Sequence, residues 1–190
     1  MNTTKPIKSY KDIQKLKNYY LERGEYRNYL LVSVCLNSAL RISDVLTLKW
    51  DRLYSFSSHR VKTHISIKEK KTGKRTEIFI NAALKSAVKL YIKNKGLPSD
   101  NAYIFTGENT PNLPLTRTQA HRIIKSAGNA LGLDISCHSL RKTFGYQAWK
   151  QGVPPVMLMK VYNHSAFSIT KRYLGIEQED KDKIFETVKL

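Results

Sequence analysis

His138-Ser139-Leu140-Arg141 opens the final part of the chain, followed by Tyr162-Asn163-His164-Ser165 and then by Thr170-Lys171-Arg172-Tyr173-Leu174. Arginine guanidinium groups and histidine N–H groups donate hydrogen bonds to phosphate oxygens. A tyrosine phenolic oxygen can act as a nucleophile and form a covalent intermediate. His138 lies three residues before Arg141, so on a helix both side chains project from one face. These segments therefore predict a phosphate site beside Tyr173. Because the chain has 11 tyrosines, Tyr173 considered by itself could instead be a half-buried packing residue with no chemical role.

The charge of the chain points to a polyanionic partner. Lysine and arginine outnumber aspartate and glutamate by 33 to 15, which gives a net charge of +18 and an isoelectric point near 9.9. Such an excess costs stability through self-repulsion, so it usually serves binding. Because the cations run the length of the chain, nucleic acid is the leading partner. A generic solvated basic surface is the alternative.

Cysteine content and hydropathy predict a reduced, cytoplasmic and nucleoid-associated protein. The two cysteines are Cys35, inside the apolar run 30–36, and Cys137. The N-terminus has no apolar leader, and no segment approaches the roughly 18 apolar residues of a membrane span. We therefore expect no membrane partner.

The periodicity of the chain predicts one mainly helical domain with a small antiparallel sheet. Residues 25–38 are apolar on most sides, which is typical of a buried central helix. Apolar and polar residues alternate over 61–67 and again over 76–80, on either side of a turn at Thr72-Gly73. This pattern indicates a β-hairpin with lysines at its tip. Further helices are expected over 9–22, 82–95, 138–151, 155–162, 168–174 and 178–189, and after Thr116.

Two cations outside the final part of the chain are candidates for the same site. Arg41 follows the central helix and begins the segment 41–46, where Ser43 or Asp44 could cap a sharp helix start. Its alternative role is a surface ion pair with Asp44. Lys71 stands at the hairpin tip, where a flexible cation could reach a DNA groove or simply be solvated.

Together these segments resemble the tyrosine recombinase, or phage integrase, family. Residues 39–44 resemble its first arginine box, 71–73 its hairpin lysine, and 138–141 its His-x-x-Arg box. Residues 163–165 and 170–174 resemble its closing histidine and nucleophile boxes. The match covers about residues 25–175 in the family's order. Ala39, Asn163 and Lys142 depart from residues that the family often has there, namely glycine, glycine and a second histidine.

The resemblance implies a role for each residue. Tyr173 would attack the scissile phosphate, giving a 3′-phosphotyrosine and a free 5′-hydroxyl. Arg41, Arg141 and His164 would stabilise charge on the phosphate. Lys71 would protonate the leaving 5′ oxygen, His138 would assist proton movement at the tyrosine, and Asp44 would support the site. Neither a cofactor nor a catalytic metal is implied.

The resemblance also implies an architecture. We expect an α+β, mainly helical catalytic domain over 1–190 with a small three-stranded antiparallel sheet, the fold of DNA breaking-rejoining enzymes. Only 1–24, an N-terminal arm and helix, precede the matching region, so we expect no N-terminal core-binding domain. A compact member, similar to the fimbrial phase-variation recombinases, is favoured over an excised catalytic domain. Helix 178–190 would dock on a neighbouring protomer or on its own core.

The expected function is site-specific DNA recombination by integration, excision or inversion. The partners would be double-stranded DNA with paired recognition sites and further copies of the chain, assembled as a tetramer. Expected DNA contacts outside the catalytic set are Lys74, Arg75, Arg117, His121 and Arg122. The alternatives are a DNA-binding accessory protein that has lost strand transfer and a type IB topoisomerase.

Overall fold

The structure is a computed structural model that describes residues 4–188, except the side chains at 179, 183 and 184. Its helices are α1 (Tyr10–Leu21), α2 (Tyr26–Ser38), α3 (Ile42–Val45), α4 (Trp50–Leu53), α5 (Ala82–Lys95), α6 (Arg117–Leu131), α7 (Cys137–Lys150), α8 (Pro155–Val161), α9 (Phe167–Leu174) and α10 (Gln178–Thr187). Its strands are β1 (Tyr54–Ser55), β2 (Arg60–Val61), β3 (His64–Lys68), β4 (Arg75–Phe79), β5 (Thr106–Gly107) and β6 (Thr110–Pro114). Ile184 and Leu190, which support the predicted apolar stripe of the last helix, lie outside what is described.

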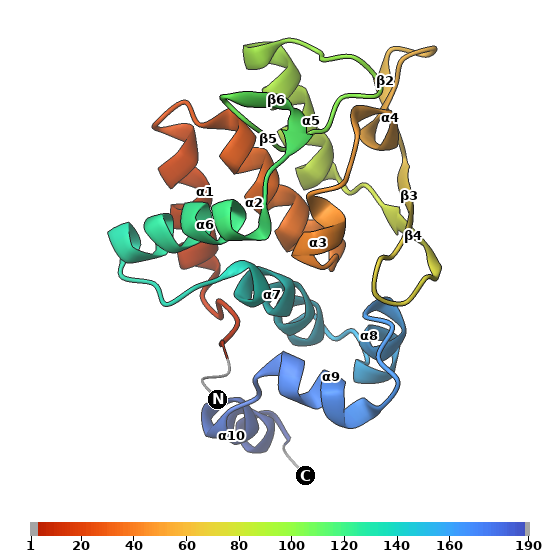
Figure 1. The fold of residues 1–190 in the computed structure, drawn as a ribbon. Helices are drawn as coiled ribbons and strands as arrows, with labels where there is room; N and C mark the ends of the chain where they lie inside the picture. The colour runs from red at the N-terminus through yellow and green to blue at the C-terminus, as the bar shows by residue number, and fades with distance from the viewer. Residues whose placement is uncertain (1–3, 189–190) are drawn as a thin grey trace.

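Helix α2 forms the centre of the domain, as its apolar sequence predicted. It contacts α1, α5 and α7, and its side chains from Leu30 to Val34 are almost completely buried (Figure 1). Burial on several faces requires apolar side chains all round the helix. Local caps fix the neighbouring helices, because Ser9 accepts from the Asp12 N–H and Thr116 forms a capping box with Gln119. The predicted mainly helical α+β fold is confirmed.

The predicted three-stranded sheet is wrong in its strand pairing. The described strands form separate antiparallel pairs, β1–β2, β3–β4 and β5–β6. In the β3–β4 hairpin Ile65 pairs with Ile78, and Ile65 is fully buried. The chain leaves strand geometry at Lys62-Thr63, so Val61 pairs with Tyr54 and does not extend the β3 strand. The β3–β4 hairpin is therefore a two-stranded sheet, and its tip extends toward α8 (Figure 1).

Helices α7, α8 and α9 pack around a second apolar cluster below the main core. Its buried members are Ala39, Leu158, Tyr162 and Leu174. Tyr162 crosses α7 at Gly145, where an added Cβ would overlap the Tyr162 hydroxyl. That hydroxyl donates to the Arg141 carbonyl at 2.8 Å. The close crossing fixes the segment before His164 against the helix that carries Arg141.

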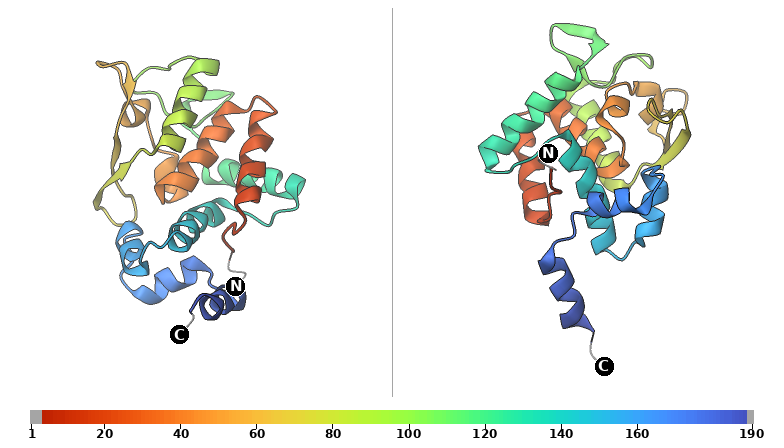
Figure 2. Two further views of the ribbon diagram at one scale, coloured as in Figure 1. Left: turned by 180° about the vertical axis from the view of Figure 1, so that it is seen from behind. Right: turned by 60° about the horizontal axis from the view of Figure 1, so that its bottom comes forward.

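The N-terminal arm and α10 pack on the other side of α7. The Ile7 N–H donates to Thr143 Oγ1 at 2.8 Å, and Asp180 accepts from Tyr146 Oη at 2.8 Å and from Lys8 Nζ at 2.7 Å. Burial opposes ionisation of Asp180, but hydrogen bonds from Glu177, Lys8 and Tyr146 lower its pKa to about 2. The first turn of α10 is therefore anchored to its own chain, while the rest of the helix extends away from the body (Figure 2).

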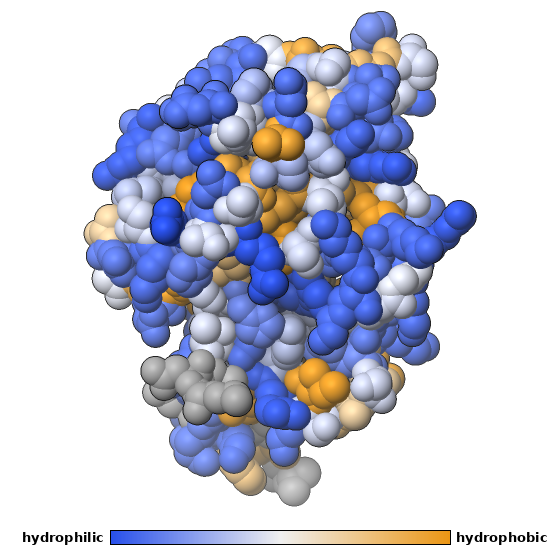
Figure 3. Space-filling view, viewed as in Figure 1, coloured by the Kyte–Doolittle hydropathy of each residue, from blue (hydrophilic) through white to orange (hydrophobic). Residues whose placement is uncertain are grey.

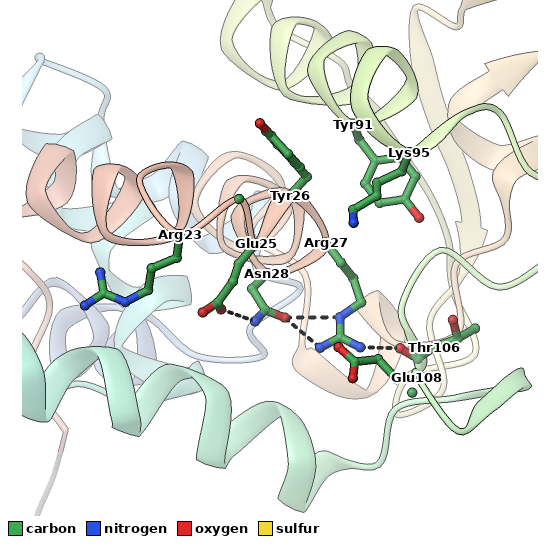
Figure 4. Close-up of a pocket in the computed structure, with 11 residues that line it drawn as sticks. Arg23, Glu25, Tyr26, Arg27, Asn28, Tyr91, Lys95, Thr106 and Glu108 are labelled. Carbon is green, nitrogen blue, oxygen red and sulfur yellow. Dashed lines mark hydrogen bonds between the residues drawn. The ribbon is translucent and has the colours of Figure 1, made fainter.

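A hydrogen-bond network joins the α1–α2 turn to the β5–β6 hairpin. Arg27 donates to the Thr106 carbonyl at 2.6 Å and to Asn28 Oδ1 at 3.1 Å, and Asn28 donates to Glu25 at 2.6 Å (Figure 4). These groups line a pocket of about 600 Å³.

No helix in the described residues has the length and apolar character needed to cross a membrane.

Candidate functional site

Arg141 is a buried cation with unused hydrogen-bond donors. It lies on α7, whose start is fixed by a capping box between Ser136 and Ser139. Its side chain is 4% exposed, and one Nη2 hydrogen bond to the Tyr162 carbonyl spans 3.2 Å. Nε and Nη1 are buried without a partner in the described part of the chain. Unpaired buried donors on a charged group are costly, so this geometry suits a site that receives an anion.

Arg41 enters the same site from the end of α2. Ala39 has φ 55°, a left-handed conformation that turns the chain sharply and makes Arg41 the residue before α3. Arg41 Nη1 lies 2.6 Å from Glu69 Oε2. The alternative role of Arg41, a surface ion pair with Asp44, is therefore wrong. The expected cap by Ser43 or Asp44 is also wrong, because no side chain in the described residues caps the start of α3. Asp44 Oδ1 instead accepts from the Lys70 N–H at 3.0 Å, which holds the base of the hairpin turn beside Arg41.

Tyr173 lies on α9, half-buried among the other expected site residues. Its ring centre is 4.9 Å from that of His138 and 4.5 Å from that of His164, both edge-on. The Arg141 guanidinium carbon lies 5.7 Å from the same ring centre. Tyr173 thus does pack against its neighbours, as the simple alternative expected. Those neighbours are the side chains that the sequence placed around a phosphate.

Burial and cations favour the neutral form of both histidines. Burial is the largest cause that lowers the pKa of His164 to about 4, followed by the charges of Arg141, Arg41 and Lys71. Partial burial and neighbouring cations also lower the pKa of His138 to about 4, although the residue as a whole is more exposed than His164. His164 Nδ1 lies 2.9 Å from Thr170 Oγ1, which orients the ring. An entering phosphate anion would raise both pKa values, because it favours the imidazolium form.

A protein-family model matches most of the sequence. The model of the phage integrase family covers residues 8–179, most of the chain. The chain belongs to the phage integrase family. It is therefore a tyrosine recombinase-type enzyme by membership, and the candidate site residues from Arg41 to Tyr173 lie within the matched residues.

Relatives and solved structures agree with this membership. A probable integrase/recombinase of Bacillus subtilis strain 168, YoeC, is 38% identical over 180 residues, which are 94% of this chain and 93% of YoeC. The crystal structure of the XerA recombinase superposes with a TM-score of 0.77 at 16% identity, covering 100% of this chain and 66% of XerA. The XerH recombinase, in a post-cleavage complex with a palindromic difH substrate, superposes with a TM-score of 0.73 at 17% identity. The match covers 98% of this chain and 54% of the XerH chain. The chain thus spans little more than half of some recombinases with its fold.

Lys71 of this integrase-family chain is exposed in the turn between β3 and β4. Its charge acts on His164, which places it within electrostatic range of the histidine. Lys142, where the family often has a second histidine, is 4% exposed and donates to the Thr4 carbonyl at 2.7 Å. Its ammonium lies 5.7 Å from the Tyr173 ring centre, so the N-terminal arm holds a cation beside the tyrosine.

The other expected DNA contacts are all exposed, and they fall into two groups. Lys74 and His164 line a recess of about 280 Å³, and Arg75 lines a cavity of about 570 Å³ with Arg41 and Arg141. Arg117, His121 and Arg122 lie on the first turns of α6. The Arg117 charge acts on Cys137, which places this helix start beside that of α7. Their contacts with DNA stay predictions.

Glu69 is the site residue that the sequence analysis missed. It is 5% exposed and contacts Arg41, Thr72, Thr76 and Asn163. A single acid within the basic run Lys68-Glu69-Lys70-Lys71 was the available signal.

In the described residues no group of three or more His, Cys, Asp or Glu side chains could hold a metal ion.

The low pKa of His164 predicts a pH-dependent loss of stability. The ordinary histidine pKa is 6.5, against about 4 in the folded protein. Between these values the unfolded chain binds more protons than the folded one, so the free energy of unfolding falls as pH falls through this window. We predict that His164→Gln reduces this pH dependence, measured by urea unfolding at several pH values. An unchanged slope would show that His164 titrates normally.

Proposed function

We propose that the chain is a site-specific DNA recombinase that cleaves and rejoins strands through a 3′-phosphotyrosine. The observation that carries this proposal is Arg141, a buried cation whose unpaired Nε and Nη1 lie in the site that contains Tyr173. Arg41 lines the same cavity, and both histidines flank the tyrosine ring. A phosphate bound there would meet an arginine fork and a nucleophile together.

The roles follow from the groups at each position. Tyr173 Oη attacks phosphorus while its proton passes toward His138, which is neutral in the free protein because its pKa is lowered to about 4. Arg41, Arg141 and His164 donate to the non-bridging oxygens, where charge increases. The bond from phosphorus to the 5′ oxygen breaks, and Lys71 gives that oxygen a proton. Rejoining reverses each transfer, and the phosphotyrosine conserves the bond energy.

The surface charge supplies affinity for DNA. The net charge of +18 predicts binding that weakens steeply with salt, because each phosphate contact releases counterions. An accessory DNA-binding protein and a type IB topoisomerase share this property, so salt dependence does not separate them from a recombinase. A protein that only binds DNA has no need of a nucleophile, whereas here Tyr173 lies beside the buried, unpaired donors of Arg141. This observation favours strand transfer, while the choice among integration, excision and inversion stays open.

We also propose assembly of copies on paired DNA sites, as a tetramer, through exchange of α10. Asp180 ties the first turn to its own chain, whereas Phe185 is 80% exposed and Val188 58% exposed. Exposed apolar side chains also lie over α8 and the start of α9, among them Val156, Met157 and Phe167 (Figure 3). Two such patches on one chain suit a head-to-tail contact that closes into a ring.

Covalent capture tests the proposed chemistry and requires no assumption about the target sequence. A pool of nicked duplexes with a randomised central segment is incubated with the protein, and complexes that survive detergent are recovered and sequenced. A nick lets the cleaved strand diffuse away, so the tyrosine adduct accumulates. We predict recovery of a defined sequence by the wild type and none by Tyr173→Phe. Failure to recover an adduct from the pool and from DNA flanking its gene would overturn the proposal.

Replacing Arg141 should separate stability, binding and cleavage. We predict that Arg141→Met lowers single-turnover cleavage of the captured duplex by about 100-fold or more, since a charge-stabilising donor is lost. DNA affinity should change little because many other cations remain. The free energy of unfolding should stay equal or rise, because an apolar side chain replaces a buried charge with unpaired donors. If binding fell as much as cleavage, Arg141 would position DNA and would not stabilise the reaction.

A further inference from the structure

Glu69 joins three segments of the site through one carboxylate. Oε2 accepts from Arg41 Nη1 at 2.6 Å and from Thr72 Oγ1 at 3.2 Å. Oε1 accepts from Thr76 Oγ1 at 2.9 Å and from Asn163 Nδ2 at 2.5 Å. These donors come from the residue before α3, from the β3–β4 hairpin and from the segment that leads into His164.

The surroundings keep Glu69 ionised. Burial opposes the charged form, but hydrogen bonds from Thr76, Asn163 and Arg41 outweigh it and lower the pKa of the carboxyl. With both oxygens engaged and only 5% exposure, the carboxylate has a defined position. A charged group in that position holds its arginine partner in a matching one.

Asn163 gives the cluster a residue-specific link to the histidine segment. Its φ is 53°, in the left-handed region that suits glycine and that asparagine tolerates better than most residues. The backbone turn alone could therefore be made by glycine. The asparagine amide adds the bond to Glu69, which fixes the residue next to His164 to the hairpin that carries Lys71.

We propose that Glu69 is a positioning residue for strand cleavage, acting chiefly through Arg41. Its ion pair holds the Arg41 guanidinium toward the cavity shared with Arg141, and its bond to Asn163 joins the Lys71 turn to the His164 segment. This inference rests on the proposed recombinase function. The pair with Glu69 uses one of the five N–H groups of Arg41, which leaves donors for a phosphate. Glu69 is thus placed to orient Arg41 for phosphate binding.

The test compares two substrates on the duplex recovered by covalent capture. One carries the normal scissile phosphate. The other carries a methylphosphonate, in which a methyl group replaces a charged oxygen, so the reaction depends less on arginine. We predict that Glu69→Gln slows adduct formation on the phosphate by roughly 10- to 100-fold, as expected for a misplaced catalytic group, with DNA affinity nearly unchanged. On the methylphosphonate the defect should shrink to within about twofold.

The ratio of the two rates does not depend on how much variant is folded, because both substrates meet the same preparation. Glu22→Gln is the control, since Glu22 is an exposed carboxylate at the end of α1, outside the cavity that holds Arg41 and Arg141, and should react like wild type. Asn163→Gly keeps the left-handed turn and removes the amide. It should slow cleavage less than Glu69→Gln does, and it should add little in the Glu69→Gln background.

Several outcomes would overturn the inference. An equal defect on both substrates would mean that Glu69 does not act through Arg41, and faster cleavage by Glu69→Gln would mean that the carboxylate blocks the site. Wild-type rates in Glu69→Gln would remove its role altogether. These results require a wild-type adduct. If the wild type formed none, the recombinase proposal itself would fail.

Discussion

The site depends on one unfavourable arrangement, the burial of Arg141 without a full set of partners. A guanidinium at 4% exposure with unpaired Nε and Nη1 lowers the stability of the folded protein. The neighbouring structure sustains this arrangement through direct contacts. Tyr162 accepts from Arg141 through its carbonyl and donates to the Arg141 carbonyl, and its ring lies 5.1 Å from the guanidinium carbon. Gly145 makes room for that crossing.

The rest of the site is organised around this cation by groups that come from distant parts of the chain. Glu69 connects Arg41, the hairpin and the segment before His164, and the N-terminal arm holds Lys142 beside Tyr173. Lys8 and Tyr146 anchor the first turn of α10 through Asp180, on the side of α7 away from the hairpin. Helix α7 thus contacts Tyr173 through Arg141 and the C-terminal helix through Tyr146.

Local sequence predicted the helices well because their signals are local. Ser9, Thr116 and Gln119 mark helix starts by bonds within one turn, and the apolar residues of α2 identify a buried helix. The expected site residues come from their spacing and the family resemblance. The structure places Arg41, His138, Arg141, His164 and Tyr173 close together, and their roles stay predictions. Glu69 was not found, because its partners Arg41 and Asn163 lie 28 and 94 residues away. The strand pairing was wrong for the same reason, since pairing depends on where the chain turns in three dimensions.

The most direct measurement of the central claim is a crystal structure of the protein with orthovanadate and DNA of the captured sequence that lacks the scissile phosphate. Vanadate can then take the phosphorus position between the two free hydroxyls and mimic the five-coordinate phosphorus of the reaction. We predict vanadium bonded to Tyr173 Oη, with Arg141 Nε and Nη1 both donating to its oxygens and Arg41 still paired with Glu69. A vanadate bound elsewhere, with the Arg141 donors still unpaired, would contradict it.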